Sequence, residues 1–295
     1  MSALAEPNGA PIVDPRARRR RLLRRRFLRR PMAVGGLVVV LVFVVMAIFA
    51  PWLAPFDPSA TDFNATLAHG SARHLLGTDE FGRDQLSRLI WGARASMQVG
   101  FLSTLLGMGI AVPLGMVAGY YRGWIDTVIA RVTDVLLSFP FLILAVGLAA
   151  ILGASLLNAT LALGISAVPA FIRIARGETL ALREEDYIPA AVVNGANDAT
   201  IIFKHILPNM TNTLLVQATV TIPGAIVGEA VLSFLGLGVQ PPKPSWGTML
   251  QDAQQYLAQA PRMAVYPGLA IVFAALAFNV LGDGLRDILD PRTTR

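Results

Sequence analysis

The chain has 295 residues, of which 54% are hydrophobic and only 15% are charged, and its mean hydropathy is +0.57. A soluble domain carries about 25% charged residues, so this composition indicates a polytopic membrane protein. The chain contains no cysteine, which excludes disulfides and thiolate-bound metals. The three histidines lie far apart in the sequence, and we expect neither a metal site nor a cofactor: His69, His74 and His205.

The positive net charge of +6 comes from one segment, the first 30 residues. They hold ten arginines and only two acids, so this arm is near +8 and the remainder of the chain is near −2. Such an arm can bind nucleic acid, but this one runs directly into an apolar segment at Pro31. Arginines beside a membrane span are explained by topology and by anionic lipid headgroups. We therefore expect membrane lipid as a partner and no nucleic acid.

The first predicted span is Met32–Leu53, which contains no charge and exceeds the roughly 20 apolar residues that a crossing helix needs. A cleaved signal peptide is the alternative. Its apolar core would be about 7–15 residues long and would end in small residues. This core is longer and ends in Pro51, Trp52 and Pro55, which favours a retained helix.

Residues 54–94 are too polar to lie in lipid. Their last part begins an amphipathic helix, Asp84–Val99, that leads into a second span, Ala95–Tyr121. Residues 135–172 then form an uncharged run that, as one helix, would be ~57 Å long, about twice the hydrocarbon thickness. We expect it to fold back at Gly153, Ser155 and Asn158, giving a third span, Val132–Leu152, and a fourth, Leu157–Arg176.

Two further spans, Met210–Gly238 and Ala264–Gly282, complete an all-α bundle of six transmembrane helices with both termini on one side. Placing the arginine-rich arm in the cytoplasm assigns 19 Lys and Arg residues to inner segments and six to outer ones, as the positive-inside rule requires. The expected organisation is therefore a cytoplasmic arm (1–30), a first helix with an outer loop (31–93), a core of five spans (94–285) with a cytoplasmic segment (177–208), and a cytoplasmic tail (286–295).

Small and kink-prone residues lie within these spans. Glycines four residues apart allow helix backbones to approach closely, and prolines bend helices or are accommodated by packing. The glycine pairs are Gly115 with Gly119 and Gly224 with Gly228, and the prolines are Pro113, Pro140, Pro169 and Pro223.

The segment 177–208 is predicted to contain two short helices. Asp186 is a suitable N-cap, Pro189 fits only a first turn, and Asn194-Gly195 is a good stop signal. A second short helix follows from Asn197 or Asp198 to Ile206, and we expect Pro208 to end it. Short, apolar helices exposed to water need a partner to cover them. The alternative is a connecting loop that packs on its own bundle.

This helix pair resembles the EAA loop of binding-protein-dependent ABC permeases. Two alanines, Ala190 and Ala191, are followed by Gly195 and, after a spacer, by Leu207-Pro208. The usual glutamate is replaced by Pro189, which is a frequent departure in the peptide-importer branch, and His205 stands where isoleucine is common. The resemblance assigns contact with an ATPase to Glu184, Glu185, Asp186, Tyr187, Pro189, Ala190, Ala191, Gly195, Leu207 and Pro208.

Other stretches resemble the C-type subunit of the dipeptide/oligopeptide (and nickel) permease family. They are the segments 77–94, 229–247 and 281–292, so the resemblance covers residues 30–292 in order. It implies a type I ABC importer permease fold in the cell membrane and four kinds of partner: a B-type permease, two cytoplasmic ATPases, an external binding protein and lipid. The chain has no GxxxxGK[ST] loop, so ATP hydrolysis is assigned to the partners.

Substrate contacts are harder to predict. Asp134 and Glu229 lie in or beside spans, where a charge faces a substrate path or forms a salt bridge within the bundle or at a subunit interface. The outer loops either dock the binding protein or cap the pore. Peptides are the expected cargo, with nickel chelates or glutathione as alternatives.

Two other function classes are disfavoured. An intramembrane enzyme is disfavoured because no histidine lies within a span, and a stand-alone transporter or channel because no inverted repeat is evident.

Overall fold

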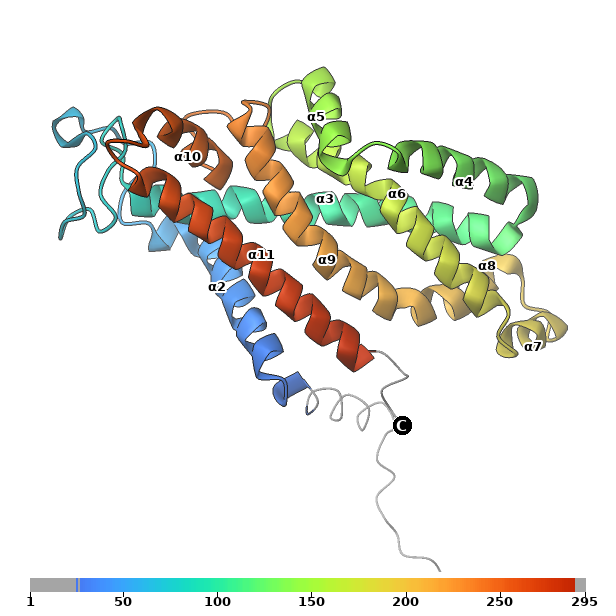
Figure 1. The fold of residues 1–295 in the computed structure, drawn as a ribbon. Coiled ribbons are helices and arrows are strands. Elements are labelled where there is room, and N and C mark those ends of the chain that lie inside the picture. The colour runs from blue at the N-terminus through green and yellow to red at the C-terminus, as the bar shows by residue number, and fades with distance from the viewer. Residues whose placement is uncertain (1–24, 26, 290–295) are drawn as a thin grey trace, which may run out of the picture.

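In the computed structural model, which describes residues 25 and 27–289, the chain folds into a bundle of helices (Figure 1). Five helices are long and apolar enough to cross a membrane: α2 (Pro31–Leu53), α3 (Gln85–Tyr121), α6 (Leu156–Arg183), α9 (Leu207–Phe234) and α11 (Arg262–Leu289). Shorter helices are α4 (Gly123–Leu137), α5 (Phe141–Leu152), α7 (Tyr187–Val193), α8 (Asp198–Thr200) and α10 (Trp246–Ala253), with single turns at Phe63–Ala65 and Gln254–Tyr256. The described residues form no strand.

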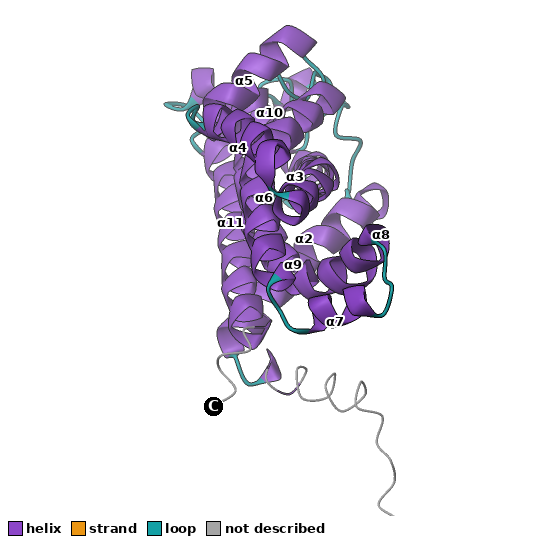
Figure 2. Cartoon of the chain, turned by 90° about the vertical axis from the view of Figure 1, so that its right-hand side faces the viewer, coloured by secondary structure: helices purple, strands orange, loops and turns teal. Residues whose placement is uncertain are grey.

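The bundle has two ends, which we name after the short helices that lie there, the α10 end and the α7 end (Figure 2). With α4 and α5 taken as one crossing, the chain passes between these ends six times, so α2 begins and α11 finishes at the α7 end. The predicted all-α bundle is thereby confirmed among the described residues, with five membrane-crossing helices, or six crossings if the bent pair α4 and α5 is one span. Most of the basic arm and the last six residues lie outside the described residues.

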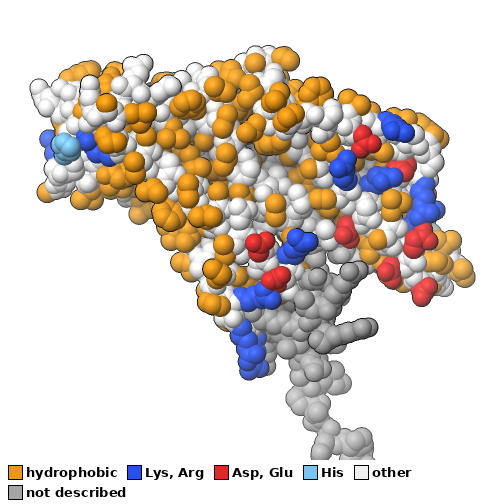
Figure 3. Space-filling view, viewed as in Figure 1, with side chains coloured by type: hydrophobic (Ala, Val, Ile, Leu, Met, Phe, Trp, Pro, Cys, Tyr) orange, Lys and Arg blue, Asp and Glu red, His pale blue; other side chains and the backbone are white. Residues whose placement is uncertain are grey.

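The outer surface between the two ends is apolar. In α2 only a stripe at helical spacing is buried, including Val40, Phe43 and Ala47, whereas Val38, Leu41 and Ile48 are about half exposed. Figure 3 shows hydrophobic side chains over the middle of this face and charged ones toward its ends. A helix that is apolar on every side is stable only against lipid or another apolar surface, so the bundle is built for a membrane.

The third span differs from the prediction of one helix over Val132–Leu152. The structure has two helices, α4 and α5, bent by 90° between Leu137 and Phe141. Pro140 explains the break, because proline has no N–H to donate and keeps the preceding residue, Phe139, out of helical geometry. The fold-back that follows was predicted correctly: Gly153 ends α5 with φ +90°, and the Ser155 hydroxyl accepts a hydrogen bond from the backbone of Asn158 at 3.0 Å.

Two other predicted boundaries were wrong. Helix α6 continues seven residues past Arg176, because Arg176 ion-pairs with Asp126 of α4 and so supports helix beyond the apolar stretch. The predicted loop 239–263 contains α10, which Ser245 and Thr248 cap reciprocally. Trp246 anchors α10: it is fully buried, and its indole N–H donates to the Leu89 carbonyl at 3.1 Å.

Helices α3 and α6 cross closely because glycine leaves space on α3. A Cβ at Gly115 would lie 2.6 Å from the Ala175 Cβ and 2.9 Å from the backbone of Ile172 and Arg176. A Cβ at Gly119 would lie 2.8 Å from Arg176 and Thr179. These contacts confirm that the first glycine pair permits close helix packing. In the second pair only Gly228 meets a neighbour, Leu163, while Gly224 faces open space.

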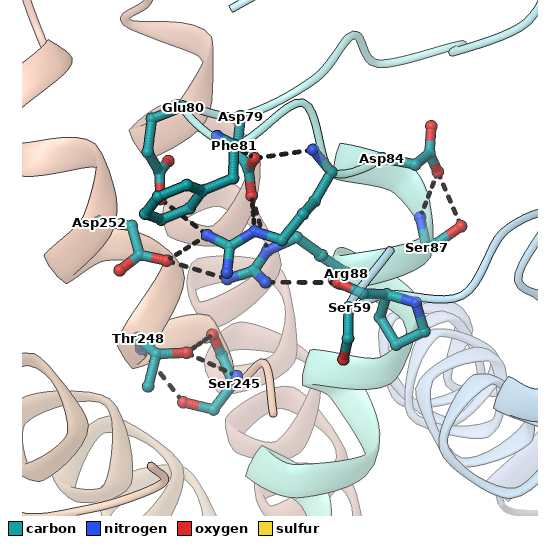
Figure 4. A network of polar contacts seen from close by, with 12 residues as sticks. Ser59, Asp79, Glu80, Phe81, Asp84, Ser87, Arg88, Ser245, Thr248 and Asp252 are labelled. Carbon is teal, nitrogen blue, oxygen red and sulfur yellow. Dashed lines mark hydrogen bonds and ion pairs between the residues drawn. The ribbon is translucent and has the colours of Figure 1, made fainter. Parts of the chain in front are cut away.

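A cluster of charged side chains ties the α10 end together (Figure 4). Arg83 Nε lies 2.5 Å from an Asp79 carboxylate oxygen, and Arg88 Nη2 lies 2.9 Å from a carboxylate oxygen of Asp252 in α10. Arg88 also reaches Asp79, at 3.2 Å, and Arg83 reaches Glu80, at 2.7 Å. Both arginine side chains are at most 8% exposed. The cluster joins the segment before α3, the first turn of α3, and α10, which are far apart in sequence.

The cluster holds three carboxylates against two guanidiniums, and one Glu80 oxygen has no hydrogen-bond partner among the described residues. Burial raises the pKa of Glu80 above its ordinary value, and the neighbouring Asp79 carboxylate raises it further. Burial likewise raises the pKa of Asp252. The folded state therefore holds a proton on these two groups more tightly than the unfolded state, and their contribution to stability grows as the pH falls.

Replacing Arg88 with glutamine should destabilise the detergent-solubilised chain by about 3 kcal/mol, because buried carboxylates lose their counter-charge. The loss in the free energy of unfolding should be smaller at pH 5.5 than at pH 8, because protonation of Glu80 and Asp252 removes buried negative charge that has lost its counter-charge. Thermal unfolding at both pH values measures this. Arg94→Gln is the matched control, because Arg94 makes no ion pair in the described part of the chain. Equal losses in the two variants would contradict the assignment.

Candidate functional site

The helix pair at the α7 end stands out from the bundle as a compact hairpin. Helix α7 spans Tyr187–Val193 with Pro189 in its first turn, and Gly195, at φ +81°, provides the turn after it. Asn197 then caps α8, its side-chain oxygen accepting from the Thr200 backbone at 2.8 Å. The predicted boundaries of the first helix are thus confirmed. Asp186 occupies the N-cap position, but its side chain makes no capping hydrogen bond, so its predicted capping role was wrong.

The second short helix does not end at Pro208, as predicted. A π-helical turn over Ile201–Ile206 joins α8 directly to α9, and Pro208 lies in the first turn of α9. The Leu207 N–H bonds to the Ile202 carbonyl, five residues back, in place of the usual four. Pro208 has no N–H to donate to the Lys204 carbonyl four residues back, and the wider turn just before it lets the helix continue past the proline. The pair is therefore mechanically continuous with a membrane-crossing helix.

Apolar contacts hold the inner side of the pair against the bundle. Ile188 of α7 is 4% exposed, and Ile201 and Ile206 of the π turn are almost fully buried. They form one cluster with Val112 and Met116 of α3, together with side chains of α6 and α9. Burial of a side chain of this size contributes about 1.5–3 kcal/mol, so these contacts hold α7 and the π turn against the bundle.

Polar contacts fix the same pair to the end of α3. The Tyr120 hydroxyl donates to the Asp198 carboxylate at 2.9 Å. The Arg183 guanidinium lies over the Tyr120 ring at 5.4 Å and donates to the Tyr120 backbone carbonyl. Arg122 and Glu184 form an exposed ion pair beside them. Tyr120, Arg183 and Asp198, named here the Tyr120 anchor, were not predicted, because nothing in the sequence pairs residues so far apart.

The outer side of the pair is apolar and exposed. Val193 is 88% exposed, and Phe203 63%. Ala190 is exposed and Ala191 half-buried, and Glu184, Glu185 and Asp186 are exposed at the start of α7. Tyr187 packs against His205, and burial and the nearby Glu185 carboxylate raise its pKa, so its phenol stays neutral. The surface combines apolar side chains with an acidic rim, which suits docking to a protein rather than catalysis.

The two predicted substrate-path acids lie in different environments. Asp134 of α4 pairs with Arg173 of α6 at 3.1 Å, and its side chain is 57% exposed. Glu229 of α9 is completely buried. Its oxygens accept hydrogen bonds from Ser96 at 2.6 Å and Ser233 at 2.7 Å. The structure does not bring the two acids together.

Two cavities were not foreseen from the sequence. One, of about 940 Å³, opens at the α10 end between the two predicted outer loops, and its cationic and aromatic lining includes Trp91, Arg94 and Lys243. The other, of about 450 Å³, lies at the α7 end between α6, α9 and α11, and its lining includes Arg173, Glu178, Asp283 and Arg286. The first cavity combines cationic and aromatic side chains, whereas the charged lining of the second has two arginines and two carboxylates.

Known proteins match this sequence over nearly its whole length. Residues 111–295 match the binding-protein-dependent transport system inner membrane component family, and residues 19–69 match the N-terminal TM domain of oligopeptide transport permease C. The glutathione transport system permease protein GsiD of Pectobacterium atrosepticum is 45% identical over 91% of this chain and 89% of its own length. The dipeptide transport system permease protein DppC of Alkalihalophilus pseudofirmus is 45% identical, with 90% and 87% covered.

The fold has a counterpart among solved structures. A chain of the MetNI methionine ABC transporter, in an inward-facing conformation, superposes with a TM-score of 0.57 at 21% identity. The match covers 70% of this chain and 98% of that one, and it supports the fold. The sequence matches and the six-crossing bundle agree, and the chain belongs to the family of binding-protein-dependent transport system inner membrane components, as a C-type permease subunit of an ABC importer.

Proposed function

We propose that this chain forms half of the translocation path of an ATP-driven importer for dipeptides and oligopeptides. The observation that carries the proposal is the exposed apolar face of the helix pair at the α7 end, in a chain whose relatives are named dipeptide and glutathione permeases. A B-type permease completes the path, two ATPases bind the α7 end, and an external binding protein delivers the cargo. ATP hydrolysis occurs in the ATPases.

The orientation follows from charge. Arginines flank the start of α2 and the end of α11, at the α7 end, and the arm before α2 adds more. By the positive-inside rule, this charge supports a cytoplasmic α7 end. The α10 end then faces the binding protein, and its 940 Å³ cavity, lined from both outer loops, lies where that protein docks. Asp134, being exposed, is the better candidate for a substrate contact, whereas Glu229 is occupied by two serine hydroxyls.

Coupling through the helix pair can be tested at its most exposed apolar residue. Val193→Asp should abolish co-purification of the ATPases, because an aspartate side chain would be desolvated in an apolar cleft. The chain itself should fold normally, since the Val193 side chain is 88% exposed. Val193→Thr keeps the shape without a charge and should retain most of the ATPase. Full retention of the ATPases by Val193→Asp would contradict the proposed docking face.

Transmission of the ATPase movement is expected to run through the Tyr120 anchor. Tyr120→Phe removes one hydroxyl, which holds Asp198, and leaves the exposed apolar residues Val193 and Phe203 unchanged. The ATPases should therefore still bind, while substrate transported per ATP hydrolysed should fall several-fold in the reconstituted transporter. Tyr266→Phe is the control, because the Tyr266 hydroxyl makes no hydrogen bond in the described residues. An unchanged ratio of transport to hydrolysis would show that the anchor plays no part in coupling.

The cargo can be identified by uptake. Proteoliposomes holding this chain, its paired permease and both ATPases should import a radiolabelled dipeptide only with ATP inside and binding protein outside. Unlabelled oligopeptides should compete for uptake more strongly than glutathione or a nickel chelate does. The reverse order of competition would reassign the cargo within the family. Uptake by the chain alone, without ATPases, would instead identify a stand-alone transporter or channel.

A further inference from the structure

An apolar groove of about 500 Å³ lies at the α7 end, between the segment before α2, α2 itself, α9 and α11. All of its lining side chains are apolar, among them Phe27, Leu37, Leu215, Leu285 and Ile288. Leu37 lies six residues inside α2, so the groove reaches ~9 Å along that helix from its first residue. The groove therefore starts at the edge of the apolar bundle and extends into it.

Arginines stand at the mouth of this groove. Arg29 and Arg30 directly follow the lining residues Phe27 and Leu28, and Arg25 precedes them. Arg30 pairs with Asp287, which lies on α11 between two lining residues. Arg25 and Arg29 are exposed, and no carboxylate pairs with them in the described part of the chain. Figure 3 shows basic side chains at this tip of the molecule, with acidic ones just above them. Positive charge thus remains beside an apolar slot.

We infer that this groove binds an anionic phospholipid of the cytoplasmic leaflet. One acyl chain fills the apolar slot, and the phosphate contacts Arg29 and its neighbours. A peptide segment is a poor fit, because its backbone would need hydrogen-bond partners that the apolar lining does not supply. An acyl chain needs none. Basic pockets between transmembrane helices on the cytoplasmic side are a recognised setting for anionic headgroups. The inference does not depend on which cargo is transported.

The test uses the full chain, purified in mild detergent and titrated with phosphatidylglycerol while native mass spectrometry counts bound lipid. Phosphatidylcholine with the same acyl chains is the reference. The wild type should bind one phosphatidylglycerol at least fivefold more tightly than phosphatidylcholine. Arg29→Gln should weaken phosphatidylglycerol binding about fivefold, the effect of one arginine near an anionic surface, and leave phosphatidylcholine unchanged. Leu285→Trp, which fills the slot, should abolish the tight site.

Two control variants separate this site from general membrane affinity. Arg131→Gln removes an exposed arginine on α4, and Val272→Trp enlarges an exposed side chain in the middle of α11. Neither should alter the tight site. The inference is overturned if the wild type holds both lipids equally, if Arg131→Gln weakens binding as much as Arg29→Gln, or if Leu285→Trp retains the tight site. The exposed Arg29 change cannot disturb packing, so it tests the headgroup even if Leu285→Trp misfolds.

Discussion

The structure depends on one constraint: a bundle whose outer surface is apolar must satisfy its polar groups internally or gather them at its two ends. The crossing helices satisfy their own backbone, because lipid supplies no hydrogen-bond partners. Glu229 shows the internal solution, since two serine hydroxyls occupy its carboxylate oxygens within the bundle. Other charged groups are gathered at the ends of the bundle, as in the charged cluster at the α10 end and the arginine ion pairs at the α7 end. Charge is therefore concentrated at the places where partners and solvent are met.

Helix α3 connects these two ends. Its first turn carries Arg88 of the charged cluster, and its end carries Tyr120 of the Tyr120 anchor, about 48 Å farther along the helix. The glycines of α3 bring it against α6, whose far end leads to α7. Because glycine lets the two helices pack closely, a force applied to the helix pair is carried by stiff, packed elements. Such an arrangement suits rigid-body movement between two states better than local bending.

The break at Pro140 and the π turn at Ile201–Ile206 are two ways in which this chain accommodates a proline in a helical segment. In each, proline withholds a backbone donor. Before Pro140 the chain leaves helical geometry and turns by 90°, which separates α4 from α5. Before Pro208 a wider turn keeps the helix continuous, so α9 begins without a gap. The first arrangement forms a corner beside the bundle, and the second joins the exposed helix pair to a crossing helix.

The sequence by itself determined the all-α membrane bundle, the fold-back at Gly153 and the position of the exposed helix pair, because these follow from local properties: hydropathy, chain length and turn residues. The resemblance in segments such as Gly77–Arg94 identified the family. Only the tertiary structure decided which side chains contact one another across the bundle. The Arg88–Asp252 contact joins residues 164 apart, and the Tyr120–Asp198 hydrogen bond joins residues 78 apart. No periodicity records such pairings, because they arise from helix packing. The same reason explains why the response of the chain to Pro140 and Pro208 could not be predicted, since packing around each proline selects between a corner and a wider turn.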